Sequence, residues 1–195
     1  MSRNILRIVV LVTGLFIAFG CQESKNQPVV DTFTVKSSQL INQILLDKEF
    51  FDCSCFLGFP EQTLLELAEL TYPESKIRTR SLDALEINDL NTLDSLDRLS
   101  RNLNVADLQL SFDIDLLPRA MFDSILRKHG SVRGKEILWE KCPEGWLYMS
   151  RPVFNKDYTT AIIEVSVCSP GGSVKVYDLI DGNWVLRERL ISWIS

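Results

Sequence analysis

The sequence predicts an α+β fold, in which N-terminal helices pack on a C-terminal four-stranded antiparallel β-meander. Helical spacing of apolar residues over residues 37–130 predicts the helices. Runs rich in β-branched and aromatic residues over 145–195, separated by turn-forming residues, predict the strands. The chain of 195 residues has the length of one domain, and its 46% hydrophobic content is ordinary for a globular protein. We therefore expect a single α+β domain over 37–195. Residues 1–20 and 21–36 precede this domain and are not part of it.

Residues 1–20 have the three parts of an export signal. Arg3 and Arg7 supply the positive end, residues 8–19 are apolar and uncharged, and the small Gly20 precedes Cys21. An apolar run of about a dozen residues is too short to span a bilayer, which takes roughly 20. The ending Ala18-Phe19-Gly20-Cys21 resembles the lipobox of bacterial lipoproteins. The alternative is a conventional secretory signal that ends by chance at a cysteine.

The lipobox resemblance implies a lipid anchor. In that family the cysteine thiol carries a diacylglycerol, the signal is cut before it, and the new amino terminus carries a further fatty acid such as palmitate. Cys21 would then be the lipid-anchor site and the membrane the first partner, with the protein in the cell envelope, facing outside the cytoplasm. Gln22 in place of Asp favours the outer membrane if the host is Gram-negative. Residues 21–36, polar and interrupted by Pro28, then form a flexible tether.

Charge argues against two kinds of partner. Without residues 1–20 the chain has 19 Lys and Arg against 26 Asp and Glu, a net charge of −7. A net-negative domain without a basic cluster is a poor ligand for nucleic acid, so we expect no nucleic-acid partner. Adsorption to anionic lipid headgroups is disfavoured for the same reason.

The helix-rich part is expected to begin with two helices. Ser37 or Ser38 can cap a helix that runs to about Phe51. A second helix is predicted to begin at Pro60 and to end before Pro73, because proline fits the first turn of a helix and interrupts its interior.

Between residues 82 and 128 two interpretations compete. The spacing around Leu85 recurs around Leu108, 23 residues later, which is within the range of leucine-rich repeats, but two copies cannot bury a solenoid core. The simpler interpretation is a short strand near Leu85, a helix over 92–103 and a strand over 107–113. Asp115 then caps a helix that runs to about Lys128 and ends at Gly130.

The meander is predicted together with its register. Its turns are expected at 155–158, 169–172 and Asp181-Gly182. Pairing Phe154 with Thr159 places the residues of the first strand opposite those of the second, as Trp146 with Val167, Tyr148 with Val165 and Ser150 with Ile163. Pairing Ile180 with Asn183 likewise places Leu179 opposite Trp184, Tyr177 opposite Leu186 and Lys175 opposite Glu188. Both registers gather large apolar groups on one face, so we expect these aromatic residues to form core.

The last third of the chain contains a second resemblance. It is carried by Trp139-x-x-x-Pro143, Ser150-x-x-x-Phe154-Asn155-Lys156-Asp157, Thr160-Ala161 and Asp181-Gly182-Asn183-Trp184. These residues resemble the C-terminal part of uncharacterised bacterial secreted proteins and lipoproteins. The resemblance implies a fold and brings no activity with it.

Few residues suggest chemistry. His129, the single histidine, lies at the end of a predicted helix, where a cation is favoured by the helix dipole. One histidine argues against a Ser-His-Asp triad and most metal sites, so we expect no catalytic residue, metal or cofactor. Asp113 and Asp115 could share acid and base roles at a strand end, but Asp115 is better explained as a helix cap.

Four cysteines follow Cys21. In an oxidising compartment an even number predicts disulfides, with three possible connectivities. The expected register places Cys142 near Cys168, so this is the preferred pair. Cys53 and Cys55 are one residue apart: a bond between them would be strained, so they pair elsewhere or stay reduced, and a metal site lacks the usual spacing.

These observations favour a non-catalytic binding or interaction module at the cell envelope, whose partner is an envelope protein or ligand that the sequence does not identify. The alternative is a lipid-anchored, hydrolase-like enzyme whose carboxylates converge only in three dimensions. A cleft lined by two or more buried carboxylates with shifted pKa values would favour the enzyme.

Overall fold

The computed structural model describes residues 31–46, 53–111, 113–167 and 171–194 of the chain. Residues 31–195 form one compact unit with an α+β fold. The predicted signal, Cys21 and Cys168 lie outside the described residues.

The described residues contain five α-helices and seven strands. The helices are α2 (Thr32–Leu45), α3 (Leu64–Thr71), α4 (Ile77–Leu85), α5 (Leu90–Ser100) and α6 (Arg119–Lys141), with 3-10 turns at Pro73–Ser75 and Val105–Asp107. The strands are β1 (Cys55–Leu57), β2 (Asp115–Leu117), β3 (Trp146–Met149), β4 (Val153–Phe154), β5 (Thr160–Val167), β6 (Gly171–Ile180) and β7 (Asn183–Trp193).

All seven strands belong to one mixed sheet in the order β2-β1-β3-β5-β6-β7, with β4 also paired to β5. The antiparallel part, from β3 and β4 through β5 and β6 to β7, matches the predicted meander only roughly. Its first strand is divided in two, and β1 adds parallel pairing to both β2 and β3. The three-residue strands β1 and β2 are too short for an alternating pattern to reveal them.

In the hairpin of β6 and β7, the predicted register is correct next to the turn and wrong farther from it. Across Asp181-Gly182, Leu179 pairs with Trp184 and Tyr177 with Leu186, as expected. A register shift between Val176 and Tyr177 then moves β7 by one residue, so Lys175 faces Arg189 instead of Glu188, and a second shift follows between Val174 and Lys175.

In the first hairpin Phe154 pairs with Ala161 instead of Thr159, because the turn is longer than expected. The Asn155 side chain closes this turn by accepting hydrogen bonds from the Thr159 and Thr160 N–H groups, at 2.9 and 3.1 Å. The slip carries into β3, where Tyr148 pairs with Ser166 instead of Val165.

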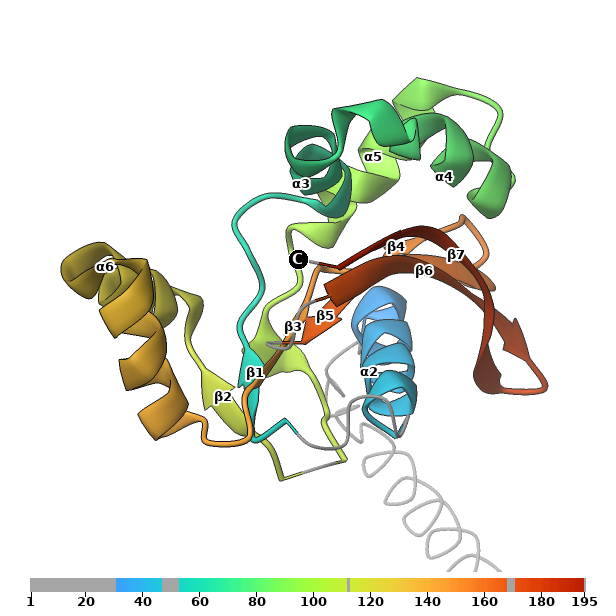
Figure 1. Cartoon of the computed structure of the whole chain (residues 1–195). Coiled ribbons are helices and arrows are strands. Elements are labelled where there is room, and N and C mark those ends of the chain that lie inside the picture. The colour runs from blue at the N-terminus through green and yellow to red at the C-terminus, as the bar shows by residue number, and fades with distance from the viewer. Residues whose placement is uncertain (1–30, 47–52, 112, 168–170, 195) are drawn as a thin grey trace, which may run out of the picture. The chain divides into compact units, whose positions relative to one another are not determined.

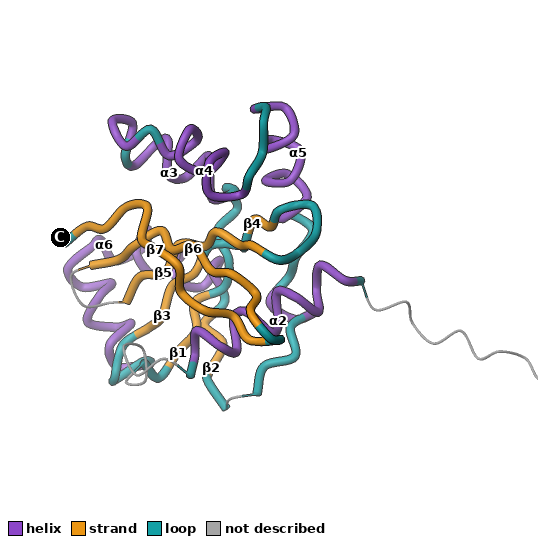
Figure 2. The backbone as a smooth tube through the Cα atoms, turned by 90° about the vertical axis from the view of Figure 1, so that its right-hand side faces the viewer, coloured by secondary structure: helices purple, strands orange, loops and turns teal. Residues whose placement is uncertain are grey.

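Helices cover both faces of the sheet (Figures 1 and 2). On one face α2 packs in a core cluster with Leu147, Ala161 and Ile163. On the other face α3, α4 and α5 pack over Ile162, Val174 and Val176. The same face carries a third cluster, in which Leu138 of α6 meets β1 and Trp146 of β3.

The helix boundaries correct several expectations. Helix α2 begins at Thr32 with Asp31 as its N-cap, so residues 32–36 are helical instead of tether, and Ser37 and Ser38 are buried inside it. The predicted helix from Pro60 is shorter and begins at Leu64, because Thr63 and Glu66 form a capping box.

The helix expected over 92–103 is α5, but the strand near Leu85 is the end of α4. The segment predicted as a strand at 107–113 begins as a 3-10 turn, because its apolar residues pack against the α2 core instead of pairing in the sheet. The repeat interpretation is therefore wrong, since Leu85 and Leu108 occupy different structures. Asp115 lies in β2 and does not cap a helix, and α6 continues past Gly130, where it kinks.

Candidate functional site

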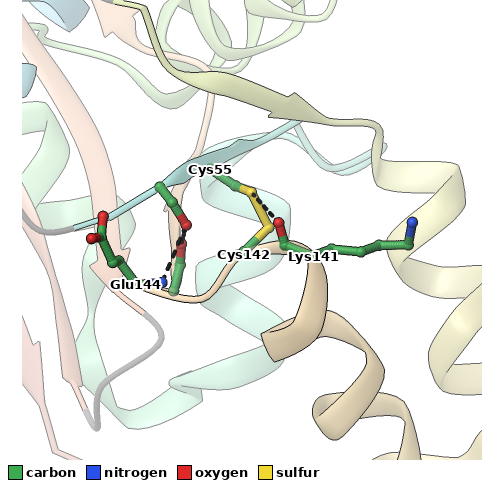
Figure 3. Close-up of a disulfide and its surroundings, with 6 residues drawn as sticks. Cys55, Lys141, Cys142 and Glu144 are labelled. Carbon is green, nitrogen blue, oxygen red and sulfur yellow. Dashed lines mark hydrogen bonds between the residues drawn. A yellow bond between two sulfur atoms is a disulfide. The ribbon is translucent and has the colours of Figure 1, made fainter.

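A disulfide joins Cys55 of β1 to Cys142, the residue after α6, with a Cα–Cα distance of 5.6 Å (Figure 3). The predicted Cys142–Cys168 bond is therefore wrong, and so is a Cys53–Cys55 bond. The sequence pattern did not predict β1, whose parallel pairing brings Cys55 opposite Trp146, four residues after Cys142.

Ser54 also fixes the connection next to the disulfide. Its hydroxyl donates to the Gly145 carbonyl at 3.2 Å and accepts from the Glu144 N–H at 3.3 Å. The Gly145 carbonyl also accepts from the backbone N–H groups of Ser54 and Cys55. Together these bonds hold β1 against the start of β3.

Two buried carboxylates stand out, and the first is structural. Asp97 of α5 accepts hydrogen bonds from the Thr63 hydroxyl and the Leu65 N–H at the start of α3. Burial raises its pKa, and these hydrogen bonds oppose the shift. Asp97 therefore ties α3 to α5.

The second carboxylate, Glu164, lies in the central strand β5 and is only 7% exposed. It points to the sheet face of α3 and α6, since it alternates with Ile163 and Val165 of the α2 core. Its backbone is held by Ser150, whose hydroxyl accepts from the Glu164 N–H at 3.0 Å. Within the described part of the chain its carboxylate has no hydrogen bond and no ion pair.

Aromatic side chains lie on the same sheet face as Glu164. Tyr148 pairs with Ser166, two residues along β5. Ser166 also pairs with Gly172, which in turn pairs with Trp193 of β7. The Trp193 indole lies over Gly172, where a Cβ would overlap it, and its ring centroid is 4.8 Å from that of Tyr72 at the end of α3. We call Glu164, Tyr148, Tyr72 and Trp193 the Glu164 site.

Burial and charge shift the pKa values of the ionisable groups of this site. Burial raises the pKa of Glu164 from 4.5 to about 7. The pKa values of Tyr72 and Tyr148 are raised by burial first and by the charge of Glu164 second. The Tyr148 hydroxyl is itself buried, and it has no hydrogen-bond partner among the described residues.

This arrangement can attract a positive charge. A carboxylate on the same sheet face as aromatic rings offers a cation a counter-ion and the negative faces of Tyr72 and Trp193, whereas the Arg119 guanidinium already lies 5.9 Å from the centroid of the Tyr148 ring. Tyr72, Tyr148 and Trp193 are each partly exposed, so solvent reaches the edge of the site. The surface hollows of about 190 Å³ beside the β4–β5 turn and about 280 Å³ between α4 and β7 lie away from Glu164, and both are smaller than most sites for drug-sized ligands.

The residues singled out from the sequence lie elsewhere. His129 is exposed at the kink of α6, Asp113 is exposed just before β2, and Asp115 is exposed as the first residue of β2. Among the described residues no three His, Cys, Asp or Glu side chains gather as a metal site would require. Sequence reasoning missed Glu164; the available signal was an acidic residue inside the apolar run Ala161–Val165.

No family model, curated protein or solved structure matches the chain. In the ranges that the structure describes, no helix has the length and apolar character needed to cross a bilayer.

Proposed function

We propose that this protein is a lipoprotein of the bacterial cell envelope, anchored through Cys21 to the outer membrane if the host is Gram-negative, and that its folded domain is a non-catalytic binding module outside the cytoplasm. The export signal and its final Gly20-Cys21 support the anchor. The Cys55–Cys142 disulfide supports an oxidising compartment, since such bonds are rare in the cytosol.

The Glu164 site is the binding site in this proposal, and its ligand is an organic cation such as a protonated or quaternary amine. The observation that carries it is a carboxylate that is 7% exposed, lacks a partner in the described residues and shares its sheet face with Tyr148 and Trp193. A buried charge without a partner is costly, and a cation would supply that partner.

Binding is better supported than catalysis. A carboxyl group that titrates near pH 7 would suit a general acid, which is the observation favouring an enzyme. The flanking hydroxyls are already engaged, however: Ser150 donates to the Arg151 carbonyl at 3.1 Å and Ser166 to the Gly171 carbonyl at 3.0 Å. The other buried carboxylate, Asp97, is occupied by Thr63 and Leu65 instead of lining the same site.

Replacement of Cys21 by Ser is expected to release the protein from the membrane fraction, because a hydroxyl cannot receive the diacylglycerol. Mass spectrometry of the native protein should find a mature amino terminus at Cys21 carrying two or three acyl chains. Cys53→Ser serves as the control and should stay in the membrane fraction. An unmodified amino terminus would refute the anchor.

Tetramethylammonium is expected to bind the full-length protein in calorimetric titration at constant ionic strength. Binding should be about tenfold weaker at pH 6 than at pH 8, because only the ionised carboxylate binds and its fraction falls by about that factor across a pKa of about 7. Glu164→Gln should abolish binding, and Trp193→Leu should weaken it.

Glu140→Gln, an exposed change on α6, is the matched control and should bind as the native chain does. Equal affinity at the two pH values, or binding that survives in Glu164→Gln, would place the ligand elsewhere.

A further inference from the structure

The kink of α6 carries a concentrated positive charge. Residues 127–135 contain Arg127, Lys128, His129, Arg133 and Lys135 and no acidic residue. We call this segment the basic elbow. Its centre is Gly130, where the backbone leaves helical geometry at φ 73° and ψ 173° before the helix resumes (Figure 1).

The elbow projects into solvent. Every residue from 127 to 133 is exposed, and a Cβ added at Gly130 would meet nothing within 4 Å. Arg133 pairs with Glu136 at 2.6 Å, whereas Arg127, Lys128 and Lys135 have no ion pair within the described part of the chain. An apolar side chain, Val132, is 75% exposed among these cations.

This local charge opposes the charge of the domain. Residues 31–195 contain 18 Lys and Arg against 25 Asp and Glu, a net charge of −7. Helix α6 alone has six Lys and Arg against three Asp and Glu, so the rest of the domain carries −10. The negative net charge of the domain therefore does not exclude contact between this basic helix and anionic lipid.

We propose that the basic elbow docks the domain on the anionic phosphate headgroups of a bilayer. Clusters of several Lys and Arg close to a bilayer are attracted to its anionic headgroups. The cations would meet the phosphates, and Val132 would enter the boundary between headgroups and acyl chains. This inference rests on the proposed function in one respect, because the lipid anchor is what keeps a bilayer near the domain.

The anchor would keep the elbow close to lipid. Residues 22–30 extend at most about 30 Å, at roughly 3.5 Å per residue, so a domain that begins at Asp31 cannot leave the surface. Tethering raises the effective concentration of the surface, so that a weak electrostatic contact is sufficient for docking. An acidic protein could also pair with the cations of the elbow. It would offer no apolar layer for the exposed side chain of Val132, whereas a bilayer does.

Hydrogen exchange of the full-length lipidated protein on vesicles tests the docking. On vesicles with about 30% phosphatidylglycerol, exchange of amides 127–135 is expected to slow roughly tenfold relative to phosphatidylcholine vesicles. The protection should be lost in about 1 M salt, where the Debye length is about 3 Å. It should also be lost when the four Lys and Arg of the elbow are replaced, as Arg127→Gln, Lys128→Gln, Arg133→Gln and Lys135→Gln.

The matched control removes four exposed cations from other surfaces, as Lys76→Gln, Arg80→Gln, Arg98→Gln and Lys156→Gln, and should keep the protection. Equal exchange on both kinds of vesicle would overturn the inference, as would protection by a soluble polyanion such as an oligonucleotide but not by anionic vesicles. The mass of the amino terminus in the same samples tests the anchor separately, so a failed anchor and a failed elbow are distinguishable.

Discussion

Removal of the Cys55–Cys142 disulfide is expected to lower the free energy of unfolding by roughly 4 kcal/mol. The bond closes a loop with a sequence separation of 87, and the entropy of the unfolded chain falls with the logarithm of loop length. The bond also joins the end of α6 to β1, whose strand is only three residues long. We therefore expect β1, β2 and α6 to loosen before the rest of the sheet.

The measurement is denaturant unfolding of Cys55→Ser/Cys142→Ser beside the native chain. Both residues are replaced because a single remaining thiol could exchange with Cys53. Hydrogen exchange should show the largest loss of protection at residues 55–57 and 115–117. A change below about 1 kcal/mol would have one of two meanings. Either contacts around Leu138 and Trp146 already order the unfolded chain, or packing of these residues holds β1, β2 and α6 in place without the bond.

The features that are most predictable from the sequence are those that depend on local chemistry. Asp181-Gly182 fixes a two-residue turn, and the pairs Leu179–Trp184 and Tyr177–Leu186 follow from it. Helix α5 was recognised from its apolar spacing, and its Asp89 cap agrees with the usual preference for Asp at that position.

The features that were missed depend on contacts between distant segments. Strand β1 has three residues and is buried on both faces, so it shows no alternation, and its partners β2 and β3 lie about 60 and 90 residues away in the sequence. Without β1, Cys55 could not be placed beside Cys142. The Glu164 site was missed for the same reason, because it is assembled from the end of α3 and from three strands.

Replacement of Glu164 by Gln is expected to stabilise the folded domain above pH 7 and to leave its stability almost unchanged near pH 4.5. The folded pKa, about 7, is raised above the ordinary value of 4.5. As the pH rises through this interval the unfolded chain releases its proton first, so the native protein loses stability, by up to about 3 kcal/mol in total. The neutral amide has no proton to release and avoids this loss.

The denaturant midpoints of Glu164→Gln and the native chain, measured from pH 4.5 to pH 8.5, should therefore differ by an amount that grows with pH. The difference should stop growing above the folded pKa of Glu164. Glu140→Gln, on the exposed surface of α6, should follow the native curve throughout. Parallel curves for Glu164→Gln and the native chain would mean that the carboxylate is already solvated or paired. A bound organic cation should act in the opposite direction to pH, because it stabilises the ionised form. Adding tetramethylammonium at pH 8 should therefore restore stability to the native chain and leave Glu164→Gln unchanged.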